Sequence, residues 1–233
     1  MAGFLEVRVE TPAAAARAAA AGADRLLAVR AHEFGDGCPL PDDVAAIRQV
    51  TTVNLRVLLR LRDGYSTGGG ELARLRGLIW SYLAAGADGF CFGFLNGLGQ
   101  VDAEVCKALA ADGDWPWTFD RAVDAAFDPS AAWAALPGLP RLDSVLTAGS
   151  ARGLRHGLDK VLGLARDPKL APLITAAGGL APEDVPWLVR AGVRRFHIGD
   201  GGEPGESDDD RLRTWRRLID GETARAASPP RNA

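Results

Sequence analysis

The sequence predicts an α/β fold, a single-domain (β/α)8 TIM barrel, on the strength of three observations. Apolar runs of strand length alternate with alanine- or leucine-rich stretches of helical spacing along the chain. Eight such units in 233 residues match the lower end of the size range of these barrels. No Pro/Gly/Ser-rich linker divides the chain. We expect residues 1–225 to form the barrel and residues 226–233 a flexible C-terminal tail, with a doubly wound sheet of about six or seven strands as the alternative.

Each unit pairs a short apolar strand with a helix. The strands are expected at residues 4–9, 25–29, 55–59, 89–92, 115–119, 144–147, 173–176 and 195–198. The helices are expected at residues 12–21, 41–50, 71–85, 102–111, 129–136, 153–165, 182–191 and 209–219. An Ala-Gly pair ends three helices, at Gly22, Gly86 and Gly192, and this is typical of a turn from a helix into a strand. Longer loops are expected at residues 63–70 and 199–210.

Composition and charge exclude several classes of protein. The chain is 47% apolar, 24% charged and has a net charge of -3, so it lacks the broad positive field that binding to nucleic acid requires. Its first residues show no basic segment followed by a long apolar run, and no later stretch reaches about 18 uncharged apolar residues. We therefore expect a cytoplasmic protein with no nucleic acid and no membrane partner.

Charged residues alternate with apolar ones along the first strand. Glu6, Arg8 and Glu10 share one face, and the apolar residues between them share the other. In a barrel the apolar face packs on the helices, so these three side chains are predicted to point into the lumen, where an unpaired ion is costly. Arg8 should then lie within salt-bridge reach of Glu6, Glu10 or Asp120. The alternative is an edge strand with a solvated face.

Other polar residues follow the carboxyl ends of the predicted strands, which form the functional face of a barrel. They are Arg60, Arg62, Asp120, Arg121, Asp124, Thr147 and His197. His197 should lie beside Glu6 and Glu10, because the first and eighth strands of a closed barrel are neighbours. Its alternative role is that of a hydrogen-bonded core residue.

Glycines follow the seventh and eighth strands. Gly178 and Gly179 let backbone N–H groups approach an anion, at the usual phosphate position of such barrels. They equally suit a tight turn into the next helix, and neither loop carries a basic residue.

Metal binding has little support in the residues. Cu(I) prefers sulfur ligands, and Cys38, Cys91 and Cys106 are expected in a loop, a strand and a helix of different units. They form no C-x-x-C pair, so neither a disulfide framework nor a zinc knuckle is indicated. Glu10, Asp120 and His197 could bind a harder divalent ion.

Seven motifs in chain order resemble those of the CutC copper-homeostasis family. They are LEVRVET (5–11), GADR (22–25), RLRDGYS (60–66), GADGFCFG (86–93), TFDRAVD (118–124), VLTAG (145–149) and AGVRRFH (191–197). The resemblance implies a TIM barrel and a role in copper homeostasis, with copper as the implied metal.

The departures from that family concern residues that a copper site would need. Arg8 and Val29 stand where the family has cysteines that have been proposed as copper ligands, and Asp120 stands where it has histidine. We expect Arg8 and Asp120 to belong to one altered polar network in the lumen. Carboxylates and arginines suit an anionic small molecule better than a soft metal.

Three functions remain open. The first is a CutC-like protein that does not itself bind Cu(I), with no certain cofactor. The second is an isomerase or lyase acting on a small anionic or phosphorylated substrate, and the third is an inert scaffold. The candidate catalytic residues are Glu6, Glu10, Arg60, Asp120 and His197, and the candidate ligand-binding residues are Arg8, Arg62, Arg121, Asp124, Thr147, Gly178 and Gly179. Glu6 or Glu10 would be the general base, His197 a general acid or an orienting residue, and Arg60 and Arg62 a clamp for the anion. We expect a homodimer.

Overall fold

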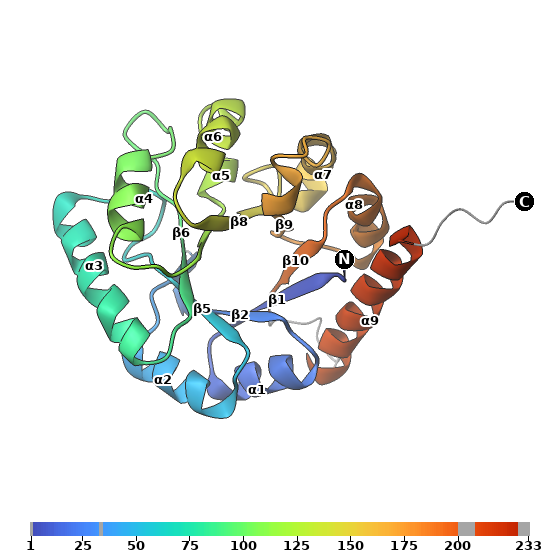
Figure 1. Cartoon of the computed structure of the whole chain (residues 1–233), viewed down its shortest axis with the longest axis horizontal. Helices are drawn as coiled ribbons and strands as arrows, with labels where there is room; N and C mark the ends of the chain where they lie inside the picture. Colours follow the sequence, from blue (N-terminus) through green and yellow to red (C-terminus); the bar gives the residue numbers. More distant parts are fainter. Residues whose placement is uncertain (1, 33–34, 200–207, 228–233) are drawn as a thin grey trace, which may run out of the picture.

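Eight parallel strands close into a barrel that is surrounded by helices. A computed structural model describes residues 2–32, 35–199 and 208–227. The barrel strands follow one another in the order β1-β10-β9-β8-β7-β6-β5-β2, so the first and last strands are neighbours (Figure 1). The predicted (β/α)8 barrel is confirmed, and the doubly wound sheet is not formed.

All eight predicted barrel strands are present, with small shifts at their ends. They are β1 Phe4–Val9, β2 Arg25–Ala28, β5 Asn54–Leu58, β6 Gly89–Phe92, β7 Trp117–Phe119, β8 Leu142–Thr147, β9 Ile174–Ala176 and β10 Arg195–Ile198. The α-helices are α1 Pro12–Ala20, α2 Pro41–Val50, α3 Gly69–Ala84, α4 Ala103–Ala110, α5 Ala122–Ala125, α6 Pro129–Ala135, α7 Leu154–Leu164, α8 Val185–Ala191 and α9 Asp208–Ala227. Short 3-10 turns cover Leu136–Gly138, Ala171–Leu173 and Pro182–Asp184.

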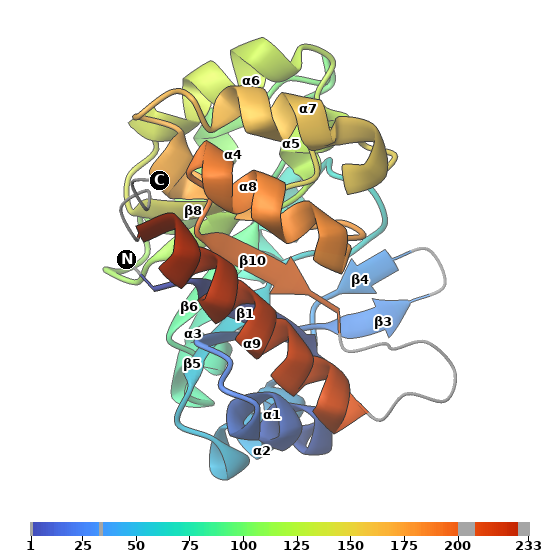
Figure 2. The same cartoon turned by 90° about the vertical axis from the view of Figure 1, so that its right-hand side faces the viewer.

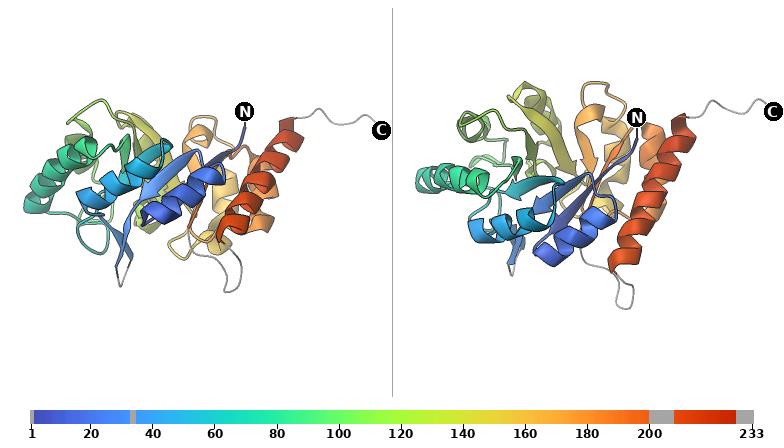
Figure 3. Two further views of the ribbon diagram at one scale, coloured as in Figure 1. Left: turned by 90° about the horizontal axis from the view of Figure 1, so that it is seen from below. Right: turned by 60° about the horizontal axis from the view of Figure 1, so that its bottom comes forward.

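The structure adds one ribbon that the sequence analysis missed. β3 Arg30–His32 and β4 Gly35–Gly37 form an antiparallel hairpin between β2 and α2. Figure 2 shows it projecting on the side toward which β10 points, and Figure 3 shows the same projection in two further views. The hairpin therefore stands at the carboxyl ends of the barrel strands, the face where a site is expected.

The last helix is longer than predicted. α9 runs to Ala227, so two residues of the expected tail are helical. Residues 228–233 of that tail and residues 200–207 of the loop after β10 lie outside the described residues. In the part of the chain that the structure describes, no helix is long and apolar enough to cross a membrane.

The turns from helix to strand work as predicted. Gly22, Gly86 and Gly192 have φ angles of 87°, 96° and 106°, in the left-handed region that favours glycine. Each of these glycines therefore reverses the chain where a helix ends.

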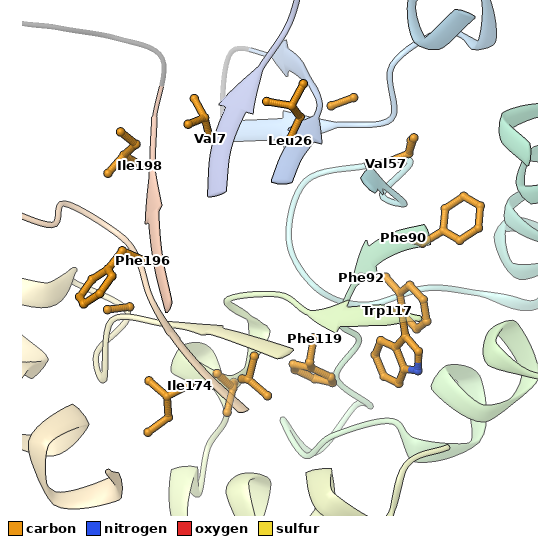
Figure 4. Packing of buried hydrophobic residues seen from close by; sticks show 14 of the residues in the cluster. Val7, Leu26, Val57, Phe90, Phe92, Trp117, Phe119, Ile174, Phe196 and Ile198 are labelled. Carbon is orange, nitrogen blue, oxygen red and sulfur yellow. The ribbon is translucent and has the colours of Figure 1, made fainter. Parts of the chain in front are cut away.

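The hydrophobic core lies between the barrel and its helices. Figure 4 shows side chains such as Val7, Phe90 and Phe196, which are all fully or almost fully buried, pointing away from the barrel axis. Trp117 stacks on Phe92 with ring centroids 4.1 Å apart. Because apolar residues fill this outer layer, the lumen is left to the alternate residues of each strand.

Candidate functional site

The half of the lumen nearer the amino ends of the strands, which we call the lower lumen, contains a buried group of charges centred on Glu6. Strand register places Glu6 opposite His197 on β10 and opposite Arg25 on β2. His197 Nδ1 lies 2.7 Å from Glu6 Oε1, and Arg25 Nε donates to Glu6 Oε2. The predicted contact between His197 and Glu6 is confirmed. Burial by itself raises the pKa of Glu6, but the Arg25 charge and the His197 hydrogen bond hold that pKa well below its usual range.

A second ion pair lies toward the amino ends of the strands. Arg56 on β5 binds Asp143 at the start of β8 through two nitrogens, with Nη1 2.7 Å from Oδ1. Arg25 Nη1 lies 3.9 Å from the same carboxylate, and Arg195 Nη1 donates to the Asp143 backbone carbonyl at 3.0 Å. The lower lumen is therefore a network of arginines and carboxylates in place of branched apolar side chains.

Above this network the lumen is apolar. A compact cluster of buried side chains separates the charged layer from the mouth. Its members are Leu27, Val29, Leu58, Cys91, Leu146 and Ala177. It forms the floor of the space above.

A cavity of about 450 Å³ opens at the carboxyl ends of the strands. Besides the apolar floor, polar groups from several βα units line it. They are Asp36, Arg60, Tyr65, Asp120, Arg121, His197 and Arg211, together with Gly178, Gly179 and Gly199. We refer to this space as the mouth cavity.

One wall of the mouth cavity is an ion pair beneath an aromatic ring. Arg60 Nη2 donates to Asp120 Oδ2, and the guanidinium carbon of Arg60 lies 4.7 Å from the Tyr65 ring centroid. The Ala122 N–H donates to Asp120 Oδ1 at 2.8 Å. Burial raises the pKa of Asp120 although the Arg60 charge opposes it. A Cβ at Gly93 would lie 2.4 Å from Asp120 Oδ1, so only glycine leaves room for this carboxylate.

The opposite wall combines a glycine turn with two arginines. Gly178 and Gly179 have φ angles of 76° and 83°. The guanidinium carbon of Arg121 lies 2.7 Å from where a Gly178 Cβ would be, and a Cβ at Gly179 would meet open space. Arg211 from α9 donates to the Gly199 carbonyl at 3.0 Å, and its Nε is buried with no acceptor in the described part of the chain. The loops after β9 and β10 have no basic residue in their own sequences, but Arg121 and Arg211 bring positive charge to this wall of the cavity.

Asp124 and Thr147 lie behind this wall. Asp124 accepts hydrogen bonds from Thr147 Oγ1 at 2.6 Å, from the Ala148 N–H at 2.8 Å and from the Gly149 N–H at 3.1 Å. Arg121 Nε also donates to it at 3.0 Å. Both residues hold the turn after β8 and orient Arg121 without lining the cavity.

The rim of the barrel mouth holds Arg8 and Glu10. Arg8 binds Asp36 of the hairpin through two nitrogens, at 2.9 and 2.7 Å, and its Nη2 lies 2.8 Å from Glu10 Oε1. The Ala31 N–H of the hairpin donates to Glu10 at 3.2 Å. The expected pairing of Arg8 with a carboxylate is confirmed, but Glu10 does not lie in the lumen because the hairpin engages it at the rim.

The structure separates the predicted site residues into two groups. Those that line the mouth cavity are Arg60, Asp120, Arg121, Gly178, Gly179 and His197, and those that do not are Glu6, Arg8, Glu10, Arg62, Asp124 and Thr147. Arg62 is about half exposed and pairs with Glu71 at 3.2 Å. Among the described residues Arg8 binds Asp36 and Glu10, whereas Asp120 binds Arg60, and no ion pair between these residues joins the two groups.

Four polar or aromatic side chains of the cavity were not predicted from the sequence: Asp36, Tyr65, Arg211 and Trp215. Tyr65 lies within the quoted motif RLRDGYS and was the only one with a local signal. The others come from the hairpin and from a helix, whose contact with the mouth depends on the tertiary fold.

The cysteines do not converge on a sulfur site. Cys91 is in the floor of the mouth cavity, Cys38 follows the hairpin outside it, and Cys106 is buried in α4. Burial raises the pKa of the Cys106 thiol to about 12, and that of Cys91 well above its usual value. Within residues 2–32, 35–199 and 208–227, no group of three or more His, Cys, Asp or Glu side chains could hold a metal ion. Glu10, Asp120 and His197 therefore do not form such a group.

Comparisons with known proteins agree on one family. The model of the CutC family matches residues 4–202. A CutC family protein of Klebsiella pneumoniae (strain 342) is 31% identical over 199 residues, which cover 84% of this chain and 80% of that protein. The human copper homeostasis protein cutC homolog is 30% identical over 199 residues, covering 84% and 72%. A crystal structure of a CutC protein of Streptococcus agalactiae superposes with a TM-score of 0.75 at 20% identity, covering 84% of this chain and 98% of that one, and supports the fold.

Proposed function

Given that the chain belongs to the CutC family, we propose that it binds a small organic anion in the mouth cavity. The observation that carries the proposal is the lining of this cavity. Arg60, Arg121 and Arg211 reach it from three different βα units, above a floor of apolar side chains. Such a site suits a molecule with an apolar body and a carboxylate or phosphate group.

The anionic group would bind against the wall formed by Gly178, Gly179, Arg121 and Arg211. Consecutive backbone N–H groups at a glycine turn and flanking guanidinium groups are typical of phosphate and carboxylate sites. The loops after the last two barrel strands are also the common phosphate position of this fold. Arg211 Nε supports the same position, because it is buried and no described residue accepts a hydrogen bond from it.

Copper fits these residues poorly. The name of the human relative refers to copper homeostasis, but Cu(I) selects thiolate or thioether ligands and the three thiols of this chain lie in separate places. We therefore propose no step through copper.

The test is a binding titration with matched arginine variants. Purified protein is titrated calorimetrically with phosphorylated and carboxylated compounds of three to six carbons and with their uncharged analogues. We expect saturable binding of an anionic compound. In Arg211→Gln the affinity should fall about 10-fold or more, because a charged hydrogen bond contributes about 1.5–3 kcal/mol.

Arg213→Gln is the control. Arg213 lies on the same helix but is exposed and does not line the mouth cavity. Equal affinities in the two variants, or no binding of any anion, would contradict the proposal.

Isomerase or lyase activity on the bound anion is the second candidate. The observation that favours it is His197, whose ring contacts both Glu6 and the mouth cavity.

A scaffold that binds no ligand predicts a titration with no binding signal for any compound. A cytoplasmic location and a homodimer stay predictions, and light scattering of the purified chain tests the second.

A further inference from the structure

The contact between His197 and Glu6 determines which nitrogen of the imidazole ring carries the hydrogen. Both oxygens of Glu6 are engaged, one by Arg25 and one by His197 Nδ1. An ionised carboxylate only accepts hydrogen bonds, so Nδ1 must carry a hydrogen. In the neutral ring Nε2 is then the acceptor, and the described residues offer it no other partner.

The His197 ring lies where it can contact a ligand in the mouth cavity. His197 lines the mouth cavity, whereas Glu6 is 1% exposed and lies below it. Glu6 therefore cannot reach a ligand, so the general-base role that the sequence suggested for Glu6 or Glu10 falls to the His197 ring. Glu10 is held at the rim by Arg8 and the hairpin.

We propose that the mouth cavity is a proton-transfer site in which His197 Nε2 is the base and Glu6 is a positioning residue. This inference rests on the proposed function, because the proton comes from the bound anion. Arg25 completes the arrangement, since its guanidinium keeps Glu6 paired in the lumen. The chain of contacts from Arg25 through Glu6 to His197 follows the general arrangement of a base oriented by a buried carboxylate.

The substrate class follows from the groups in the cavity. A carbon acid next to a carbonyl group suits a base of this kind, and an anionic tail suits the wall at Gly179. Nε2 takes the proton from carbon, the C–H bond breaks, and its electron pair moves into the carbonyl group to give an enolate. The proton on Nε2 then returns to carbon, so no oxidant or second reactant is consumed. Arg60 in the facing wall offers positive charge to the enolate oxygen.

The first test needs no ligand. Long-range ¹H–¹⁵N correlation spectra of histidine-labelled protein show which ring nitrogen carries hydrogen. The chain has three histidines, so His197→Gln assigns the signal. At mildly alkaline pH we expect the wild-type ring to be protonated on Nδ1 only. A ring protonated on Nε2 would overturn the role given to Glu6.

The second test follows carbon acidity. The probe is glycolaldehyde phosphate in D₂O, and NMR follows the loss of its C2 hydrogens. We expect exchange above the buffer rate, reduced about 10²-fold or more in His197→Gln because general-base catalysis commonly contributes that much. In Glu6→Gln exchange should also fall by about 10²-fold or more, since the ring is retained but is no longer held in the tautomer with hydrogen on Nδ1.

His156→Gln is the control, because His156 is exposed on α7 and should leave the exchange rate unchanged. If Glu6→Gln fails to fold, the tautomer of the wild-type ring and the exchange rate of His197→Gln still test the proposed base. Binding of the probe without exchange would overturn the proton-transfer site while the anion proposal stands. Binding of only carbonyl-free anions would overturn the substrate class, and binding of no anion would overturn the proposed function together with this inference.

Discussion

Glu6 lies between Arg25 and His197 on three neighbouring strands, and its carboxylate is fully surrounded by protein. Removing water from these charges is unfavourable. The attraction between the charges offsets this desolvation only while every member of the network has a partner. Loss of one partner therefore destabilises the barrel more than a surface ion pair would.

The stability of the protein should depend on Glu6 in a pH-dependent way. Glu6→Gln leaves Arg25 with only the more distant Asp143 carboxylate, 3.9 Å away, as a charge partner, which should lower the free energy of unfolding by about 3 kcal/mol near neutral pH. Because the pKa of Glu6 is lowered by folding, its contribution is complete above the usual glutamate pKa of about 4.3. It is lost as the pH falls below that value, so the difference between variant and wild type should shrink there. Urea denaturation at a series of pH values measures it.

Glu104→Gln serves as the comparison, because Glu104 forms an exposed pair with Lys107. Its effect should stay below about 1 kcal/mol. An equally large effect of both variants, or a Glu6→Gln effect that grows on acidification, would show that Glu6 is not stabilised in the way described.

For individual residues, the sequence predicted part of this charge network. Alternation along the first strand and adjacency of the first and last strands predicted the pairing of Glu6 with His197. Arg25 and Arg56 could not be found in this way, because each belongs to a mainly apolar strand and the pattern does not show which carboxylate compensates it. The partner Asp143 lies 87 residues from Arg56.

Strands with an apolar face were predicted, and the hairpin without one was missed. Periodicity reports burial on one side, so it finds barrel strands that pack on helices. Arg30, Ala31 and His32 of β3 are all exposed, and β4 reads Gly-Asp-Gly. The hairpin is formed by backbone pairing and by the Asp36 contact with Arg8, which leave no hydrophobic pattern.

Helix α7 packs on the turn after β8 through a glycine. A Cβ at Gly157 would lie 2.1 Å from the Ala148 carbonyl oxygen, so Gly157→Ala must push the helix away from the turn that Asp124 holds. We expect a loss of about 3 kcal/mol of unfolding free energy, measured by urea denaturation.

Gly163→Ala on the same helix is the matched control, because its Cβ would meet nothing within 4 Å. It should be neutral or stabilising by up to about 1 kcal/mol. Destabilisation by both variants to the same degree would mean that helix propensity, and not this close approach, decides the result.

The whole molecule assembles its mouth cavity from elements far apart in the sequence. Residues after β5, β7, β9 and β10 were predicted because the carboxyl ends of parallel strands share one face. Arg211 and Trp215 were not, since the sequence does not show which side of α9 turns toward the barrel mouth. The predicted part therefore consists of residues at strand ends, and the missing part of hairpin and helix residues together with Tyr65 in the loop after β5.

Purified protein should not hold Cu(I) at a tight stoichiometric site. Cys38, Cys91 and Cys106 occupy three separate environments, and two of the thiols are fully buried. In competition with a Cu(I) chelator, we expect no one-to-one transfer of copper to the protein. Tight binding that disappears in Cys38→Ser or Cys91→Ser would refute this and restore copper as the ligand.

Closure of the barrel by β1 and β10 also has a consequence for folding kinetics. Glu6 and His197 lie 191 residues apart, so their contact has a very high sequence separation. Such long-range contacts slow the conformational search, because the entropy of a large loop is lost before the contact forms. A partly folded chain that lacks β10 leaves Glu6 without His197, which raises the free energy of open intermediates relative to the closed barrel. The refolding rate should therefore be set by the meeting of the first and last strands, and hydrogen exchange during refolding should protect β1 and β10 last.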